Sequence, residues 1–205
     1  REQVFEPLGM TRCQVGAWSV KRVGNVAQPH AWRGERNEVV NADGGTSPDL
    51  PSMAAGGIRC SLRDMTRWMQ VLLDPTLAPG WLDTEQRRTL WTLHMPMPLG
   101  ERQRRWDNAH FYGYGYGWRV SDMDGQWKVA HTGTLSGMYS SLALLPDRKV
   151  GVVMLINGEG EDARMALMQA ALKRFTAADD ARPAMDYLAE LKADQATRAA
   201  TGHSR

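Results

Sequence analysis

The residues of this sequence best suited to chemistry are His131, Thr132 and Gly133. They stand at the end of an expected strand over residues 127–132, just before two apolar segments. A polar triplet at such a position can place hydrogen-bond donors beside a substrate. Backbone N–H groups aimed at a carbonyl oxygen stabilise the negative charge that forms there when the carbonyl is attacked. The triplet is therefore the first candidate for a wall of a substrate site.

No serine of the chain has the surroundings of a catalytic nucleophile. A lysine three positions after a serine can help to remove the serine proton, but no serine here has one; Ser19, with Arg22, comes nearest. Ser136 and Ser140 lie close to the triplet. The segment around Ser136 lacks the Gly-x-Ser-x-Gly spacing of a nucleophile elbow. We therefore expect neither serine to be catalytic.

Metal and phosphate sites are not expected. The five histidines show no His-x-x-x-His pairing, and the two cysteines, Cys13 and Cys60, lie far apart without a Cys-x-x-Cys spacing. The cysteines can form one disulfide in an oxidising compartment, but we expect two free buried thiols. The Asn-Gly-Glu-Gly run at 157–160 lacks the phosphate-loop pattern and indicates a turn. No cofactor is implied.

The composition is that of a globular protein. The 205 residues are 42% hydrophobic and 23% charged, and the net charge of +2 is too small to argue for nucleic acid or an anionic membrane as a partner. The dense basic patch Arg102, Arg104 and Arg105 is interpreted as a solvated loop, with contact to an acidic partner as the alternative. No run approaches the roughly 20 apolar residues that cross a bilayer.

The N-terminal half is predicted to be rich in loops. Residues 2–8 resemble the end of a helix, and residues 11–51 read as a long irregular segment with two short strands. A helix is predicted over 61–73, capped by Ser61, and a second over 84–94, capped by Asp83. The inward residues of these helices recur at helical spacing: Leu62, Met65, Met69 and Leu72 in the first, Leu90 and Leu93 in the second.

The C-terminal half is predicted to hold the sheet. Aromatic residues alternate with glycine over 112–118, which predicts one extended segment with all four rings on one face. Apolar strands are expected over 139–145 and 149–156, antiparallel because only a short turn joins them. Helices follow over 164–175, with a stripe of Met165, Met168, Leu172 and Phe175, and over 183–191; the chain after Lys192 is expected to fray.

Four segments resemble the serine β-lactamase-like hydrolases, which include class C β-lactamases, penicillin-binding DD-peptidases, D-aminopeptidases and esterases. They occur in that family's order and near its spacing. The segments are Val4-Phe-Glu-Pro-Leu-Gly-Met-Thr11, Ala54-Ala-Gly-Gly-Ile-Arg-Cys-Ser61 with Asp64-Met65, Tyr114-Gly-Tyr-Gly-Trp118, and His131-Thr132-Gly133 in place of the family's Lys-Thr-Gly.

The resemblance implies a fold and a set of roles. The fold is α+β: part of a β-lactamase/DD-peptidase-like fold with an antiparallel sheet and flanking helices, lacking the N-terminal strands and the nucleophile helix. His131 and Thr134 are implied to be catalytic, the latter through an oxyanion-hole amide. Thr132 and Gly133 are implied to bind a small-molecule or peptide substrate. His131, a weaker cation than lysine near neutral pH, favours esters or peptides over β-lactam carboxylates.

Two motifs that the family needs are absent from the chain: Ser-x-x-Lys, which carries the nucleophile, and the second motif, Tyr-x-Asn or Ser-x-Asn. In the family's order both would precede residue 1. We therefore expect residues 1–177 to be the C-terminal portion of such a domain, with a loop-rich helical part (11–110), the sheet and its packing helix (111–177), and a helix or tail over 178–205. The N-terminal half of the same protein is the expected partner, and this segment alone is expected to be inactive. The alternative is a non-catalytic binding module that has lost the nucleophile.

Two further expectations follow from the resemblance. The resemblance to this family suggests that the protein is periplasmic or secreted. If the N-terminal strands of the fold are absent, strand 149–156 becomes an open apolar edge, and the isolated segment should be poorly soluble.

Overall fold

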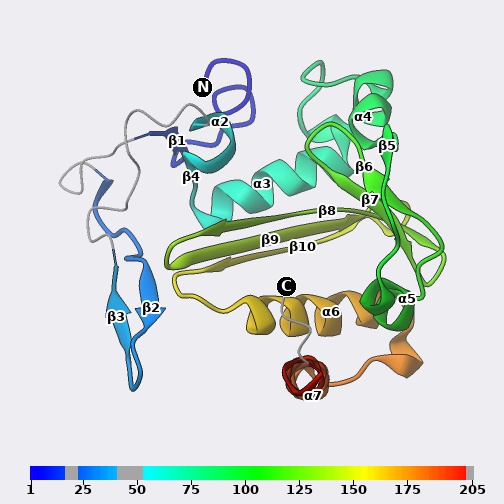
Figure 1. Ribbon diagram of the computed structural model, residues 1–205. Coiled ribbons are helices and arrows are strands. Elements are labelled where there is room, and N and C mark those ends of the chain that lie inside the picture. The colour runs from blue at the N-terminus through cyan, green and yellow to red at the C-terminus, as the bar shows by residue number, and fades with distance from the viewer. Residues whose placement is uncertain (17–22, 41–52, 202–205) are drawn as a thin grey trace.

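The computed structural model describes residues 1–16, 23–40 and 53–201, and it has the predicted α+β fold. Its centre is a six-stranded antiparallel sheet in the order β10-β9-β8-β7-β6-β5 (Figure 1). The strands are β5 (Met95–Pro96), β6 (Tyr112–Tyr114), β7 (Arg119–Met123), β8 (Gln126–Leu135), β9 (Met138–Leu145) and β10 (Val150–Ile156).

Helices cover both faces of this sheet, as Figure 1 shows. Helix α3 (Leu62–Leu73) packs on one face and α6 (Glu161–Thr176) on the other, while α7 (Ala184–Ala200) packs on α6. The alternation of β9 divides its side chains between two cores: Leu142 and Leu144 pack toward α3, Ala143 and Leu145 toward α6. Strands β9 and β10 are therefore covered on both sides, which explains their apolar sequences.

The predicted helices occur with changed ends. Ser61 caps α3, and its hydroxyl accepts a hydrogen bond from the Asp64 N–H at 3.1 Å, but Leu62 of the predicted stripe is 55% exposed. The Asp64 carboxylate accepts from the backbone N–H of Arg12 at 2.6 Å, which fixes the N-terminal turns on α3. Helix α4 (Thr84–Trp91) has its Asp83 cap and ends before residue 94 because the chain becomes extended at Thr92.

The remaining elements of the N-terminal half are short. Residues 2–8 form successive turns without a regular helix. The irregular segment contains three short strands in its described part, where two were expected; residues 17–22 and 41–51 of that segment lie outside the description. The elements are β1 (Gln14–Val15), β2 (His30–Trp32), β3 (Asn37–Val39), α2 (Met53–Gly56) and β4 (Ile58–Arg59).

The prediction of two free thiols was wrong, because Cys13 and Cys60 form a disulfide. Strands β1 and β4 pair antiparallel with Gln14 opposite Arg59, so the next pair outward brings the two cysteines together, with 4.1 Å between their Cα atoms. Sequence spacing did not reveal this, because the pairing of two two-residue strands joins segments 47 residues apart.

The prediction of one extended segment over 112–118 was also wrong. Strand β6 ends at Tyr114, and the chain then makes a tight turn in which the Gly115 N–H donates to the Trp118 carbonyl at 2.7 Å. Gly117 has a φ of +74°, which a glycine adopts readily. The rings therefore separate: Tyr116 is 60% exposed, whereas Trp118 is buried in the core under α3.

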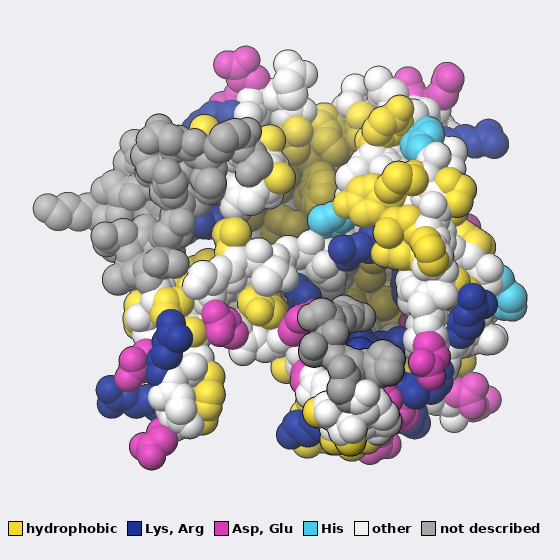
Figure 2. All heavy atoms as spheres, in the orientation of Figure 1, with side chains coloured by type: hydrophobic (Ala, Val, Ile, Leu, Met, Phe, Trp, Pro, Cys, Tyr) yellow, Lys and Arg dark blue, Asp and Glu magenta, His cyan; other side chains and the backbone are white. Residues whose placement is uncertain are grey.

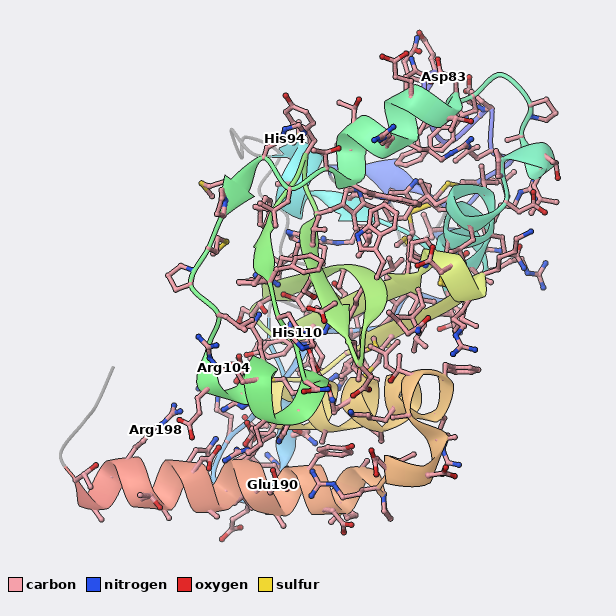
Figure 3. All side chains as sticks on the ribbon, turned by 90° about the vertical axis from the view of Figure 1, so that its right-hand side faces the viewer. Asp83, His94, Arg104, His110, Glu190 and Arg198 are labelled. Atoms are coloured by element: carbon pink, nitrogen blue, oxygen red, sulfur yellow. A yellow bond between two sulfur atoms is a disulfide. The ribbon has the colours of Figure 1, made fainter. Side chains whose placement is uncertain are left out.

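The basic patch and the tail also differ from the prediction. Arg102, Arg104 and Arg105 lie on a helix, α5 (Glu101–Asp107), which runs alongside α7 in Figure 3. Arg105 donates to Asp194 at 2.7 Å, and the Trp106 indole donates to Glu190 at 2.7 Å. These contacts hold α7, which continues as a helix to Ala200 instead of fraying after Lys192. Within the described residues, no helix is both long and apolar enough to cross a membrane.

Candidate active site

Strand β8 carries the triplet and is longer than both of its neighbours, β7 and β9. Strand β7 pairs with β8 only as far as Arg119 opposite Ala130, whereas β9 continues to Met138 opposite Leu135. Residues 131–135 are therefore paired on one side only among the described strands. Residues 131–135 of β8 therefore have a free edge on the β7 side, next to Arg119, the first residue of β7; this edge is called the open edge below.

The hairpin register fixes which backbone groups point to the open edge. A two-residue turn joins β8 to β9, so the flanking pair Leu135 and Met138 exchange hydrogen bonds, as does every second pair before it. The N–H and C=O groups of Thr132 and Thr134 consequently point away from β9, toward the open edge. The sequence-based role of Thr134 as an oxyanion donor requires this direction.

A glycine at position 133 is favoured by its neighbour Ser140 as well as by the room that an extended substrate needs. A Cβ added at this position would lie 2.5 Å from the Ser140 Oγ on the neighbouring strand. A side chain at 133 would therefore force Ser140 to move, besides obstructing an extended substrate.

The side chains of the triplet alternate between the two faces of β8, as expected for a strand. His131 shares the α3 face with Val129, and its Nε2 contacts the Tyr114 hydroxyl, the two rings meeting nearly edge to face at 79°. Burial, and secondarily the positive charge of Arg119, lower the pKa of His131 below its usual 6.5. The ring is thus neutral at pH 7, and the positive charge of the family's lysine is absent at this position.

Arg119 supplies the positive charge instead. Its guanidinium donates to the Thr132 Oγ1 at 2.6 Å from the end of β7. Because the Thr132 oxygen accepts this bond, its own proton remains available for a substrate oxygen. The sequence reasoning missed Arg119, although it directly follows the Tyr-Gly-x-Gly-Trp segment.

Arg164 of α6 is the second residue that the sequence reasoning missed. Its Nη1 lies 2.9 Å from the Gly133 carbonyl oxygen and 3.0 Å from the Thr134 Oγ1, behind the open edge. The prediction started a helix at this residue but gave it no role, because helical periodicity does not show which loops or strands a polar residue reaches.

Ser136 and Ser140 lack the partners of a nucleophile. Ser136 is exposed in the β8–β9 turn, and Ser140 is half-buried beside Gly133. No described lysine or histidine donates to or accepts from either hydroxyl. The described residues also contain no group of three His, Cys, Asp or Glu side chains that could hold a metal ion.

His131, Thr132 and Gly133 are half-buried. The face drawn in Figure 2 is hollowed near its centre, with hydrophobic walls and with a histidine next to a basic side chain at its lower rim. A separate open hollow of about 1050 Å³ lies between the N-terminal turns and α3, and it shares no lining residue with the triplet. The Gly-Gly turn reaches the end of β8, since a Cβ on Gly56 would lie 3.8 Å from Leu135.

An antiparallel sheet with helices on both faces, carrying a His-Thr-Gly triplet at an open strand edge, matches part of a β-lactamase/penicillin-binding-protein-like fold. The chain belongs to the beta-lactamase family, whose sequence profile, described as "Beta-lactamase", matches residues 1–175. No curated protein sequence gave a significant match.

Solved structures share this fold. The octameric penicillin-binding protein homologue from Pyrococcus abyssi superposes with a TM-score of 0.65 at 19% identity, over 85% of this chain and 36% of that one. The D-amino acid amidase from Ochrobactrum anthropi SV3, solved with L-phenylalanine amide, gives 0.54 at 19% identity (77% and 42%). A D-stereospecific amidohydrolase from Streptomyces sp. gives 0.53 at 18% identity (76% and 42%). The chain spans well under half the length of these proteins.

Proposed function

We propose that this chain forms the third-motif wall of a serine hydrolase that cleaves amide or ester bonds through an acyl-enzyme. The nucleophile and its base would come from polypeptide outside the 205 residues. The observation that carries the proposal is the open edge of β8, with the Thr134 N–H directed toward it. Family membership supports the reaction class.

The chemistry assigns a role to each residue of this wall. When a serine attacks the substrate carbonyl, the Thr134 N–H donates to the oxygen on which negative charge forms. The N–H of the nucleophile would be the second donor. The substrate lies along β8 like an added strand, bonded to the free backbone groups of Thr132 and Thr134. Neutral His131 accepts or passes a proton in the network with Tyr114.

Arg119 and Thr132 bear on the substrate class. A guanidinium bonded to a hydroxyl at the open edge is suited to a carboxylate, because both side chains can then donate to its oxygens. We therefore favour peptide or amide substrates that carry a free carboxylate near Thr132. Since the guanidinium of Arg119 lies beside Thr132, the absence of lysine at position 131 does not remove the attraction for an anion.

The test is hydrolysis of chromogenic amide, ester and β-lactam substrates. The 205-residue chain alone should show no turnover. A longer product of the same gene that contains a Ser-x-x-Lys segment before residue 1 should show turnover that Thr132→Val and Arg119→Gln reduce. Turnover by the 205 residues that survives both Ser136→Ala and His131→Ala would refute the assignment.

A non-catalytic binding module is the second candidate, favoured by the absence of Ser-x-x-Lys from these 205 residues. The gene sequence before Arg1 separates the two. An in-frame Ser-x-x-Lys excludes the module, whereas a start codon at the boundary supports it.

For localisation we propose the periplasm or the cell exterior. The disulfide between Cys13 and Cys60 supports this, because disulfides persist in oxidising compartments.

A further inference from the structure

Arg164 is a buried cation directly behind the candidate oxyanion amide. The residue is only 6% exposed, and its guanidinium packs 5.0 Å from the centre of the Tyr139 ring. Its Nη1 reaches three oxygens on β8 and β9: those of the Gly133 carbonyl (2.9 Å), the Thr134 hydroxyl (3.0 Å) and the Ser140 carbonyl (3.3 Å). Its Nε, by contrast, is buried without a partner among the described residues.

The Gly133 carbonyl and the Thr134 N–H belong to one peptide group. In a trans peptide these two groups point in opposite directions. The guanidinium therefore binds one end of the peptide, while the other end faces the open edge where a substrate would lie. A charge-assisted hydrogen bond to the carbonyl oxygen draws electrons through the conjugated C–N bond and makes the N–H a stronger donor.

We propose that Arg164 is a positioning residue that orients and polarises the Gly133–Thr134 peptide, so that the Thr134 N–H binds a developing oxyanion more strongly. This inference rests on the proposed function. It adds a role for Arg164 that the oxyanion-hole role of Thr134 does not by itself require. Arg164 acts through the peptide and does not touch the substrate.

A purely structural role is the rival explanation, and α6 offers a matched control for it. Gln169, also buried on α6, donates to the Trp106 carbonyl at 2.9 Å, away from the triplet. Gln169→Leu therefore removes a buried polar contact of the same helix without touching the Gly133–Thr134 peptide.

The experiment measures the base-catalysed hydrogen exchange of the Thr134 amide by NMR in the 205-residue chain. Loss of the amide proton leaves negative charge that spreads to the Gly133 oxygen, where Arg164 stabilises it. Arg164→Gln should thus slow the exchange of Thr134 about tenfold, the effect expected for a hydrogen bond to a charged group. Arg164→Lys, which keeps the charge, should slow it less. The exchange rate of the Thr132 N–H serves as the internal reference. This N–H also points to the open edge, but Arg164 does not bond the His131 carbonyl of the same peptide group.

The sign of the change separates the two explanations. Loosening of the strand can only leave exchange unchanged or accelerate it, so a Thr134 rate in Arg164→Gln that equals or exceeds the wild-type rate overturns the proposal. An equal slowing in Gln169→Leu would overturn it as well.

A measurement on the unaltered chain keeps the test decisive if Arg164→Gln does not fold. The one-bond coupling between the Gly133 carbonyl carbon and the Thr134 nitrogen should exceed that of the His131–Thr132 peptide, since polarisation raises the double-bond character of C–N. Equal couplings would contradict the proposal. Neither readout needs hydrolysis, so a failure of Arg164 to act is distinguishable from a failure of the hydrolase assignment.

Discussion

Reduction of the Cys13–Cys60 disulfide should destabilise the protein strongly. The bond closes a loop of 47 residues in the unfolded chain, which corresponds to about 4 kcal/mol of free energy of unfolding from loop closure. It also ties the N-terminal turns, whose core residues Phe5 and Leu8 pack with Val71 of α3, to the start of that helix. A loss of this size is a large part of the roughly 5–15 kcal/mol that typical domains have.

The assay is urea denaturation followed by tryptophan fluorescence, with and without a reductant. The double variant Cys13→Ala/Cys60→Ala is the control, since the reductant should not change its midpoint. Unfolding free energies that agree within about 1 kcal/mol between oxidised and reduced wild type would refute the reasoning, because the loop-closure contribution would then be absent.

The remaining predictions concern the triplet and the sheet edge. Gly133→Ala should lower the free energy of unfolding by at most about 1 kcal/mol, because the Ser140 hydroxyl can rotate away from the added methyl group; a larger loss that Ser140→Gly does not reverse would contradict the geometry. The NMR titration midpoint of His131 should lie below 6.5, and Arg119→Gln should raise it. The pKa of His131 is lower in the folded state than in the unfolded chain, so the unfolded chain binds the extra proton. The contribution of His131 to the free energy of unfolding should therefore be complete above about pH 6.5 and should fall as the pH drops toward the folded-state pKa. A titration midpoint above 6.5 would reverse the sign of this pH dependence. Since β10 is at the edge of the sheet formed by the described residues, the chain should self-associate with rising concentration, and Leu155→Lys should reduce this in sedimentation velocity; a wild-type monomer at high concentration would count against it.

Local patterns in the sequence were sufficient for much of the fold. The two apolar strands after the triplet, the helix capped by Ser61 and the helix through Leu172 all follow from periodicity, capping and short turns, which depend on neighbouring residues. The triplet itself was found because its residue types and its place on a strand recur in a known family. Its backbone direction then followed from hairpin register.

Features that depend on distant segments could not be predicted in this way. The disulfide requires β1 to pair with β4, and the roles of Arg119 and Arg164 require β7 to end before the triplet and α6 to cross behind it. Tyr114 reaches His131 only because the chain turns after β6, where the glycine alternation suggested a continuous strand. In each case the deciding contact joins segments whose separation no local pattern encodes.

The most direct test of the central claim is a structure, with a substrate trapped as an acyl-enzyme, of a product of the same gene that contains a Ser-x-x-Lys segment before residue 1. The acyl oxygen should lie about 2.7–3.1 Å from the Thr134 nitrogen, with the rest of the substrate along residues 132–134 of β8. An acyl group whose oxygen is bound elsewhere, with the open edge of β8 covered by protein, would contradict the account.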